Sequence, residues 1–471
     1  MIATFAFNMA GGMTRPAGGY IFGYAVFAVI VGLVYKALGA GERAQSNLLQ
    51  PDRTMEVFVA GIFATLTAAY LARRFAAKQS LFEKFSYRLD PELERTARSC
   101  MIVGSVVFFY LLISKPPEPG SLFAIVRSLL NGFLPISAVL GVIAQIRRSG
   151  GTRSIDLTVF LSCSLIFFGG LIGFSKEGFF TPTACWLIAA ASQRYKISIL
   201  QILGLAVFLA FVIYYLVPYS QYGRNYKSPT NNLQENLHAS SVLLSNLGLV
   251  RKLYYQGADD DITDRSGFRY FDKPAGLFDR LQMIAPDDAI IDITENGIVF
   301  GFAPTIMDIE NVVPHFIWKD KPAVNFGNIY AHEIGILTED DDTTGISFSP
   351  SGEAYHQGKW IGVLILLPVL LFFLFWVSHA VAGDLRRSPI GLVSLVSYLH
   401  AAPEGGIGAI TGLGLMGSFQ FIVAFFFIVY VLPLTTNLLL GPPARDIDQN
   451  AVIASKRRRP IRVRTVESTV E

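Results

Sequence analysis

The chain has 471 residues, of which 52% are apolar and only 16% are charged, and its mean hydropathy is +0.44. A soluble protein carries about a quarter charged residues, so this composition excludes a water-soluble globule, and it also excludes a disordered or fibrous chain. The net charge is only +3, so the positions of the charges say more than their sum. The composition predicts an integral membrane protein that crosses the bilayer several times.

Ten apolar segments are predicted to be membrane-spanning helices. The ninth is short and is followed by Pro403-Glu404-Gly405-Gly406, which predicts a broken or re-entrant helix. Such a break is tolerated at membrane depth only where it is buried in protein or faces water. In chain order the ten segments are Tyr20–Leu38, Met55–Leu71, Cys100–Ser114, Leu122–Ile146, Ile155–Phe174, Gly178–Ser192, Ile197–Leu216, Trp360–Val381, Pro389–Ala401 and Ser418–Leu440.

The distribution of Lys and Arg predicts the orientation of these spans. Every even-numbered span ends at a basic segment, as expected for the cytoplasmic side of a membrane. This pattern places both termini in the cytoplasm. The basic residues include Arg73, Arg74, Arg98, Arg147, Arg148, Arg153, Arg194, Arg386, Arg387 and the run Lys456-Arg457-Arg458-Arg459.

The predicted topology divides the chain into four parts. Residues 1–217 form a seven-helix transmembrane part, and residues 359–440 form a three-helix part. Between them, residues 218–358 form one long extracytoplasmic segment with short amphipathic helices, such as one expected over Leu233–Lys252. This segment holds 20 Asp or Glu against 10 Lys or Arg, so it is acidic where the cytoplasmic loops are basic. Residues 441–471 are expected to be a basic, disordered cytoplasmic tail that attracts anionic lipid and binds no nucleic acid.

Three motifs follow one another in the second half of the long segment. They are Val313-Pro314-His315-Phe316-Ile317-Trp318-Lys319-Asp320-Lys321-Pro322, then Gly327-Asn328-Ile329-Tyr330-Ala331-His332-Glu333, then Ser349-Pro350-Ser351-Gly352-Glu353-Ala354-Tyr355-His356. Together they resemble the Wzy-type oligosaccharide repeat-unit polymerases, which make O-antigen and exopolysaccharide. A Ser-Lys-x-Gly turn at Ser175-Lys176-Glu177-Gly178 is similar to a further motif of that family.

The resemblance implies an all-α, GT-C-like membrane glycosyltransferase of the bacterial inner membrane, with its active site on the outer face. Donor and acceptor would both be polyprenyl-diphosphate-linked oligosaccharides, and a chain-length regulator is an implied partner. The resemblance implies neither a metal nor any other cofactor.

The expected chemistry assigns roles to residue types. A diphosphate leaving group needs fixed positive charge, and the acceptor hydroxyl needs a carboxylate or imidazole to take its proton. Sugars pack on aromatic side chains. The predicted catalytic residues are Glu353, His315 and His332. The predicted substrate-binding residues are Arg127, Lys176, Arg265, Arg269, Arg280, Trp318, Lys319, Lys321, Tyr330, Tyr355 and His356.

Each of these residues also has a structural interpretation. Arg269 and Arg280 have acidic neighbours with which to pair, and Glu353 has a favourable position beside a helix N-terminus. The spacing Glu353-x-x-His356 fits a metal pair, but no second such pair follows, so no metal site is predicted. Two other functions remain open: a ligase that moves a finished glycan to another acceptor, and a transporter or flippase. A transporter is disfavoured because few ionisable residues lie in the middle of the spans.

Overall fold

The computed structural model describes residues 1–86, 92–114, 121–227, 232–260, 269–273, 275–314, 317–318, 321, 325–338, 340–341 and 344–440. The regular secondary structure of these residues is helical, with no strand. Seven helices are long and apolar enough to cross a membrane, so the chain is a polytopic membrane protein. They are Pro16–Ala40, Pro51–Arg74, Leu93–Ile113, Leu129–Arg148, Ile199–Tyr226, Pro350–Val381 and Gly406–Leu438.

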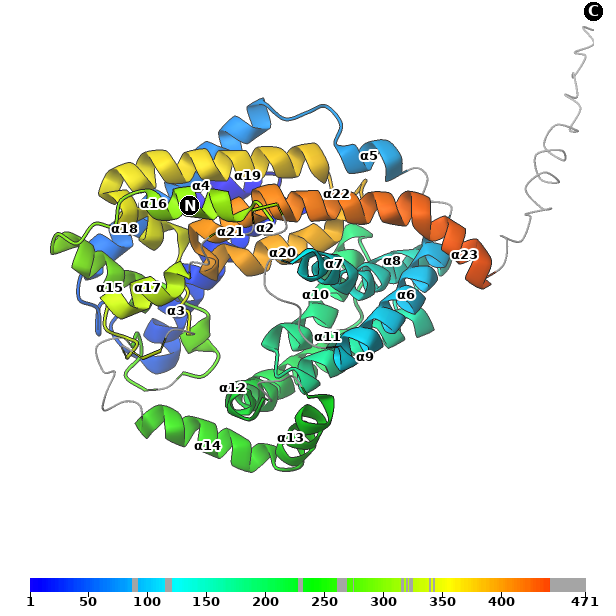
Figure 1. Ribbon diagram of the computed structural model, residues 1–471, viewed down its shortest axis with the longest axis horizontal. Helices are drawn as coiled ribbons and strands as arrows, with labels where there is room; N and C mark the ends of the chain where they lie inside the picture. Colours follow the sequence, from blue (N-terminus) through cyan, green and yellow to red (C-terminus); the bar gives the residue numbers. More distant parts are fainter. Residues whose placement is uncertain are drawn as a thin grey trace, which may run out of the picture.

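The first helix group surrounds a core made by both ends of the chain (Figure 1). Its N-terminal helices are α1 (Ile2–Met9), α2 (Pro16–Gly23), α3 (Val31–Val34) and α4 (Pro51–Arg74). They pack against α15 (Ile284–Glu295), α16 (Ala303–Asn311), α17 (Phe326–Glu333), α18 (Pro350–Ile361), α19 (Leu367–Val381) and α21 (Gly406–Gly412). Residues more than 200 positions apart in the sequence therefore share one core.

The second group lies beside the first and has its own apolar core. It contains α5 (Leu81–Phe85), α6 (Leu93–Ile113), α7 (Leu122–Asn131), α8 (Phe133–Arg148), α9 (Leu157–Ile172), α10 (Lys176–Ser192), α20 (Gly391–Glu404), α22 (Ser418–Phe426) and α23 (Leu432–Leu440). Helices α20 to α23, drawn in orange, run from the first group into the second and join them (Figure 1).

A smaller core lies at one edge of the second group. Its helices are α11 (Ile199–Phe211), α12 (Val217–Gly223), α13 (Leu233–Ser245) and α14 (Leu247–Asp260). The single helix expected over residues 233–252 is wrong in one respect, because Asn246 has non-helical backbone angles (φ −128°, ψ 37°) and separates α13 from α14. The Asn246 amide donates to the Val242 carbonyl at 3.1 Å, which stabilises this break.

All ten predicted spans contain helix, although three of them fall below the length or hydropathy that the seven reach. The predicted break after the ninth span is present: α20 ends at Glu404, and Gly406 has a left-handed φ of 58°. From Gly406 the chain continues as a 33-residue helical rod to Leu438. The predicted tail, residues 441–471, lies outside the described residues.

Segments that were predicted to share one side of the membrane meet at one end of the bundle. Leu385 N donates to the Thr14 carbonyl at 2.9 Å, and the Ser80 hydroxyl donates to the Ala382 carbonyl at 3.3 Å. Arg95 contacts Asn437 at 2.8 Å. The basic segments therefore gather at a common end, opposite the end at which α15 to α18 lie.

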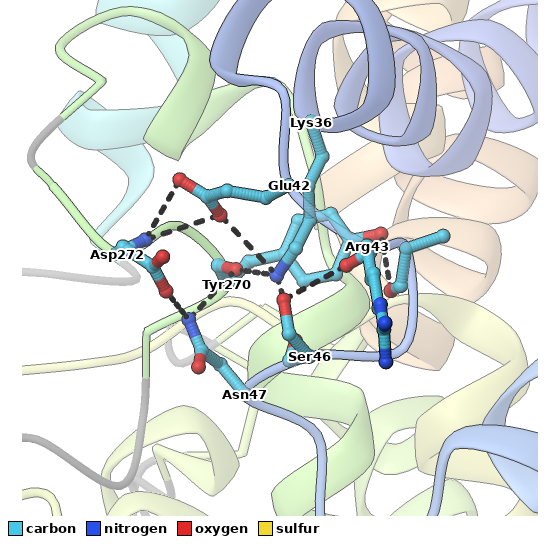
Figure 2. Close-up of polar contacts among 8 residues, drawn as sticks. Lys36, Glu42, Arg43, Ser46, Asn47, Tyr270 and Asp272 are labelled. Carbon is cyan, nitrogen blue, oxygen red and sulfur yellow. Dashed lines mark hydrogen bonds and ion pairs between the residues drawn. The ribbon is translucent and has the colours of Figure 1, made fainter.

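At that opposite end, the long segment is fastened to the first membrane helix through Lys36 (Figure 2). The Lys36 side chain is fully buried, lies over the Tyr270 ring at 4.0 Å, and donates to the Ser46 and Tyr270 carbonyls. Asn47 donates to Asp272 at 2.8 Å, and this bond fixes the same loop, which contains Tyr270. Because the ammonium is surrounded by acceptors from two distant segments, it holds the loop against the helix.

Candidate active site

A cavity of about 340 Å³ opens where the Gly406–Leu438 rod begins. It lies between α16, α17, α18 and the turn that joins α20 to α21. Three carboxylates reach it, and several of its other residues are glycines, which leave room for a ligand. Its lining consists of Asp308, Asn325, Phe326, Gly327, Tyr330, Gly345, Ile346, Ser347, Phe348, Glu353, Glu404, Gly405, Gly406 and Gly408.

Glu353 is the most firmly held of the three carboxylates. It is buried, and its Oε2 accepts a hydrogen bond from the Ile407 backbone N–H at 2.6 Å. Its Oε1 accepts from the Gln357 amide at 3.3 Å. The carboxylate thus lies at the N-terminus of the rod, where the helix dipole favours negative charge. The structural and the functional interpretation of Glu353 are therefore compatible, because the same group caps one helix and faces the cavity.

Gly406 makes this arrangement possible. Its φ of 58° lies in the left-handed region, where a side chain is strained. A Cβ at this position would also lie 2.3 Å from Glu353 Oε2. The glycine pair after the ninth span therefore marks the place where a carboxylate approaches the backbone.

Asp308 comes from α16 and faces the same helix start. A Cβ at Gly408 would lie 3.3 Å from both of its carboxylate oxygens. Burial raises the pKa of the Asp308 carboxyl to about 6. Such a group is ionised at neutral pH and is more basic than an ordinary aspartate, which suits it to accept a proton.

Tyr330 forms an aromatic wall beside the carboxylates. Its ring packs on Phe300, Phe326 and Phe348 with centroids 5.4 to 5.9 Å away, and its hydroxyl is buried without a hydrogen-bond partner among the described residues. Burial raises its pKa, so the hydroxyl stays protonated. Behind the ring, His356 contacts Glu333 at 3.0 Å and Thr294 at 2.9 Å, and these bonds fix the imidazole away from the cavity lining.

A buried polar network positions the start of α18, which carries Glu353. The Asp287 carboxylate accepts from the Ser349 backbone N–H at 2.9 Å. The Ser349 hydroxyl lies 3.0 Å from that of Ser351, which in turn accepts from the Tyr24 hydroxyl at 2.7 Å. Burial raises the pKa of Asp287 to about 8. This network connects α15, α18 and the first membrane helix, so it sets where Glu353 points.

The far end of α18 is fixed by Glu295. Tyr355 donates to Glu295 at 2.6 Å, and Arg53 contacts the other oxygen at 3.3 Å. These bonds, led by the one from Tyr355, lower the pKa of Glu295. The backbone then departs from helical geometry at Gly358 and Lys359, with a positive φ of 48° at Lys359. Tyr355 therefore positions α18 and does not line the cavity.

Several predicted site residues are close in sequence to the cavity residues, but they contact other parts of the structure. The Lys321 ammonium donates to the Asn311 and Val313 carbonyls at 2.8 and 2.7 Å, where it closes the turn after α16. His332 contacts the Asp341 carbonyl at 3.1 Å. Trp318 is 38% exposed and lies outside the cavity lining. Their positions favour structural roles for Lys321 and His332.

Among the predicted diphosphate-binding cations whose side chains the structure describes, Arg127, Lys176 and Arg269 lie outside this lining. Arg269 precedes the buried Tyr270, and Arg280 ends a short turn whose Phe278 stacks on Tyr35 at 3.8 Å. Their neighbours Tyr270 and Phe278 pack at the end of the first membrane helix that carries Tyr35 and Lys36. Lys176 begins α10, and Arg127 lies on α7 with one buried guanidinium nitrogen unpaired among the described residues. His315, Lys319 and Arg265 lie outside the described residues.

Two carboxylates of the cavity, Asp308 and Glu404, were not predicted from the sequence. Glu404 had a visible signal, since it stands beside the glycine pair at the predicted helix break. Asp308 had none, because one Asp in a short helix does not stand out from the other acidic residues of the segment. Among the described residues, no group of three His, Cys, Asp or Glu has the geometry of a metal site.

In comparisons with protein-family models, curated proteins and solved structures, nothing matches this chain.

Proposed function

We propose that this chain is a membrane glycosyltransferase that polymerises polyprenyl-diphosphate-linked oligosaccharides on the outer face of the bacterial inner membrane. One observation carries the proposal. Two buried or half-buried carboxylates, Glu353 and Asp308, reach one cavity at the start of a membrane helix, beside an aromatic wall. The motif resemblance supplies the substrate class, and the cavity supplies groups that suit its chemistry.

In the proposed reaction, a hydroxyl of the incoming repeat unit attacks the anomeric carbon of the growing chain. The new C–O bond forms as the bond to the polyprenyl diphosphate breaks, and the diphosphate leaves with the electron pair. Asp308 accepts the hydroxyl proton, because its carboxylate has no hydrogen bond from the described residues and is the more basic for its burial. Glu353 is held by Ile407 and supplies negative charge to the developing oxocarbenium-like carbon.

The diphosphate itself requires cations, and the described residues that line the cavity include none. Arg269 and Arg280 remain the proposed ligands, since their neighbours Tyr270 and Phe278 pack at the Tyr35–Lys36 end of the first membrane helix and a guanidinium matches a phosphate oxygen pair. The donor would then extend from these arginines to the carboxylates.

The test measures glycan chain length made by the reconstituted protein from lipid-linked repeat units. Asp308→Asn and Glu353→Gln should each lower turnover by about 10²–10³-fold. The Gln side chain keeps an oxygen for the Ile407 N–H, so the fold is preserved. Glu310→Gln is the matched control, because it removes the same charge from an exposed site on α16.

The products distinguish the alternatives. In cells, loss of a polymerase leaves single repeat units on the final acceptor. Loss of a ligase would leave long chains on the polyprenyl lipid, and loss of a flippase would trap single units on the cytoplasmic face. Full-length glycan from both Asp308→Asn and Glu353→Gln would refute the assignment of this cavity.

A further inference from the structure

A second cavity, of about 750 Å³, lies at the other end of the bundle. It is formed where the start of α6, the end of α8 and the start of α9 meet, together with the loop between α8 and α9. Its lining combines arginines with apolar side chains. The residues are Arg98, Met101, Ile102, Gln145, Arg148, Ser149, Thr152, Arg153, Asp156, Leu157 and Thr158.

The charge that the lining can offer to a ligand is positive, because its arginines keep free N–H donors. Asp156 is the one acidic residue among the described residues of the lining, and its carboxylate accepts from the Val159 N–H at 2.9 Å, so it caps α9. Glu94, outside the lining, pairs with Arg98 and with Arg148 at 2.8 Å. Each guanidinium has five N–H donors, so both arginines keep donors for a ligand. The Arg153 guanidinium has no partner within the described part of the chain.

The loop that carries Arg153 has a defined shape. Gly150 and Gly151 both adopt a positive φ, which turns the chain back after α8. The Ser149 hydroxyl then donates to the Arg153 carbonyl and accepts from the Arg153 N–H, both at 2.9 Å. Arg153 is thereby placed beside the end of α8, which carries Arg148.

One wall of the cavity continues into the surface that faces lipid. Leu157 is 71% exposed and Phe160, one turn further along α9, is 61% exposed. Both belong to an apolar helix, whose exposed side chains contact acyl chains in a membrane. A ligand that fits this site therefore has a negative headgroup attached to an apolar tail.

We propose that this cavity binds an anionic phospholipid, with the phosphate held by Arg98, Arg148 and Arg153 and an acyl chain lying along Leu157 and Phe160. Arginine suits this role because its fork matches two phosphate oxygens. Basic pockets between membrane helices are the usual sites for acidic lipid headgroups. The proposal does not depend on the glycosyltransferase function, since it concerns the opposite end of the molecule.

The experiment measures lipid binding to the full chain in zwitterionic detergent micelles, by native mass spectrometry and by thermal unfolding. Phosphatidylglycerol is compared with phosphatidylcholine of the same acyl chains, and with glycerol phosphate, which has the headgroup chemistry without the tail. The test variant is Arg98→Gln/Arg148→Gln/Arg153→Gln. The control is Arg73→Gln/Arg74→Gln/Arg147→Gln, which removes three positive charges at the same end but outside the cavity.

Phosphatidylglycerol should bind the wild type and the control alike, and should bind the test variant about 10- to 100-fold more weakly. The single variant Arg153→Gln breaks no bond of the described fold. Its affinity for phosphatidylglycerol should lie between that of the wild type and that of the test variant. Equal binding by the test variant, or equal binding of phosphatidylcholine, would overturn the proposal. The proposal would also be overturned if glycerol phosphate stabilised the wild type against thermal unfolding as well as the lipid does. The site would then bind a soluble phosphate.

Discussion

The two cavities of this protein differ in how they are built. The basic cavity uses residues from one stretch, 98 to 158, and its arginines belong to basic segments that were predicted to lie on the cytoplasmic side. The acidic cavity gathers Asp308, Glu353 and Glu404 from three separate elements at the start of a membrane helix, where Glu353 is buried and the other two are partly exposed. Exposed arginines hold an anion without a change in their own ionisation, whereas burial raises the pKa of Asp308 to about 6, where it can take up a proton. The acidic end therefore suits proton transfer, and the basic end suits binding.

The sharpest way to test this difference is the pH dependence of turnover. Asp308 acts only as the carboxylate, so turnover should fall about tenfold per pH unit below its pKa of about 6. An ordinary Asp would give a flat profile down to about pH 4. The profile is measured with the reconstituted protein between pH 4.5 and 8.

The triple substitution of Arg98, Arg148 and Arg153 serves as the comparison, because arginines do not titrate in this range. In this variant, turnover should fall at low pH over the same pH range as in the wild type. The separate roles of the two ends would be contradicted if the triple substitution shifted the pH at which turnover falls. They would also be contradicted if turnover of the wild type did not fall below about pH 6.

A smaller effect is expected on stability, through Asp287. Its folded pKa of about 8 lies above the ordinary value of 3.8, so the folded state holds a proton that the unfolded state has lost. This stabilisation is full below about pH 4 and is lost as the pH rises towards 8. Between pH 6 and 8 the loss is about 2–3 kcal/mol, which should lower Tm by several degrees.

Asp287→Asn mimics the protonated acid and keeps the oxygen that accepts from Ser349. Its Tm should match the wild type near pH 6 and should exceed it at pH 8.5. If Tm changed with pH equally in the two proteins, Asp287 would not be the group that titrates.

The smallest expected effect is that of a chelator. The reaction proposed for the acidic cavity uses carboxylates for proton transfer and arginines for the diphosphate, so EDTA should leave the turnover of lipid-linked units unchanged. Turnover that disappears with EDTA and returns with Mg²⁺ would instead make Asp308, Glu353 and Glu404 candidate metal ligands.

The sequence predicted the helical membrane architecture because a span must be continuous and apolar, which is a local property of the chain. It also predicted the break at Gly405-Gly406, since a glycine pair at the end of an apolar segment is visible locally. The partner of Glu353 was not predictable, because Ile407 N–H comes from a helix 54 residues away. Lys321 illustrates a different limit: its charge suggested a phosphate ligand, but residue type does not indicate that its ammonium contacts two backbone carbonyls of the preceding turn.

The helix that begins at Gly406 has a consequence for where the acidic cavity lies in the bilayer. Its 33 residues rise about 50 Å, whereas the hydrocarbon layer is about 30 Å thick. The mismatch is relieved by tilting or by projection into the headgroup layer. Because Leu438 lies near the basic segments at the opposite end, the excess length carries Gly406 and Glu353 towards the headgroup layer on the other side of the membrane. In the reaction proposed above, a lipid-anchored diphosphate and a hydrated sugar would meet at this depth, and neither would have to leave its own solvent to reach the carboxylates.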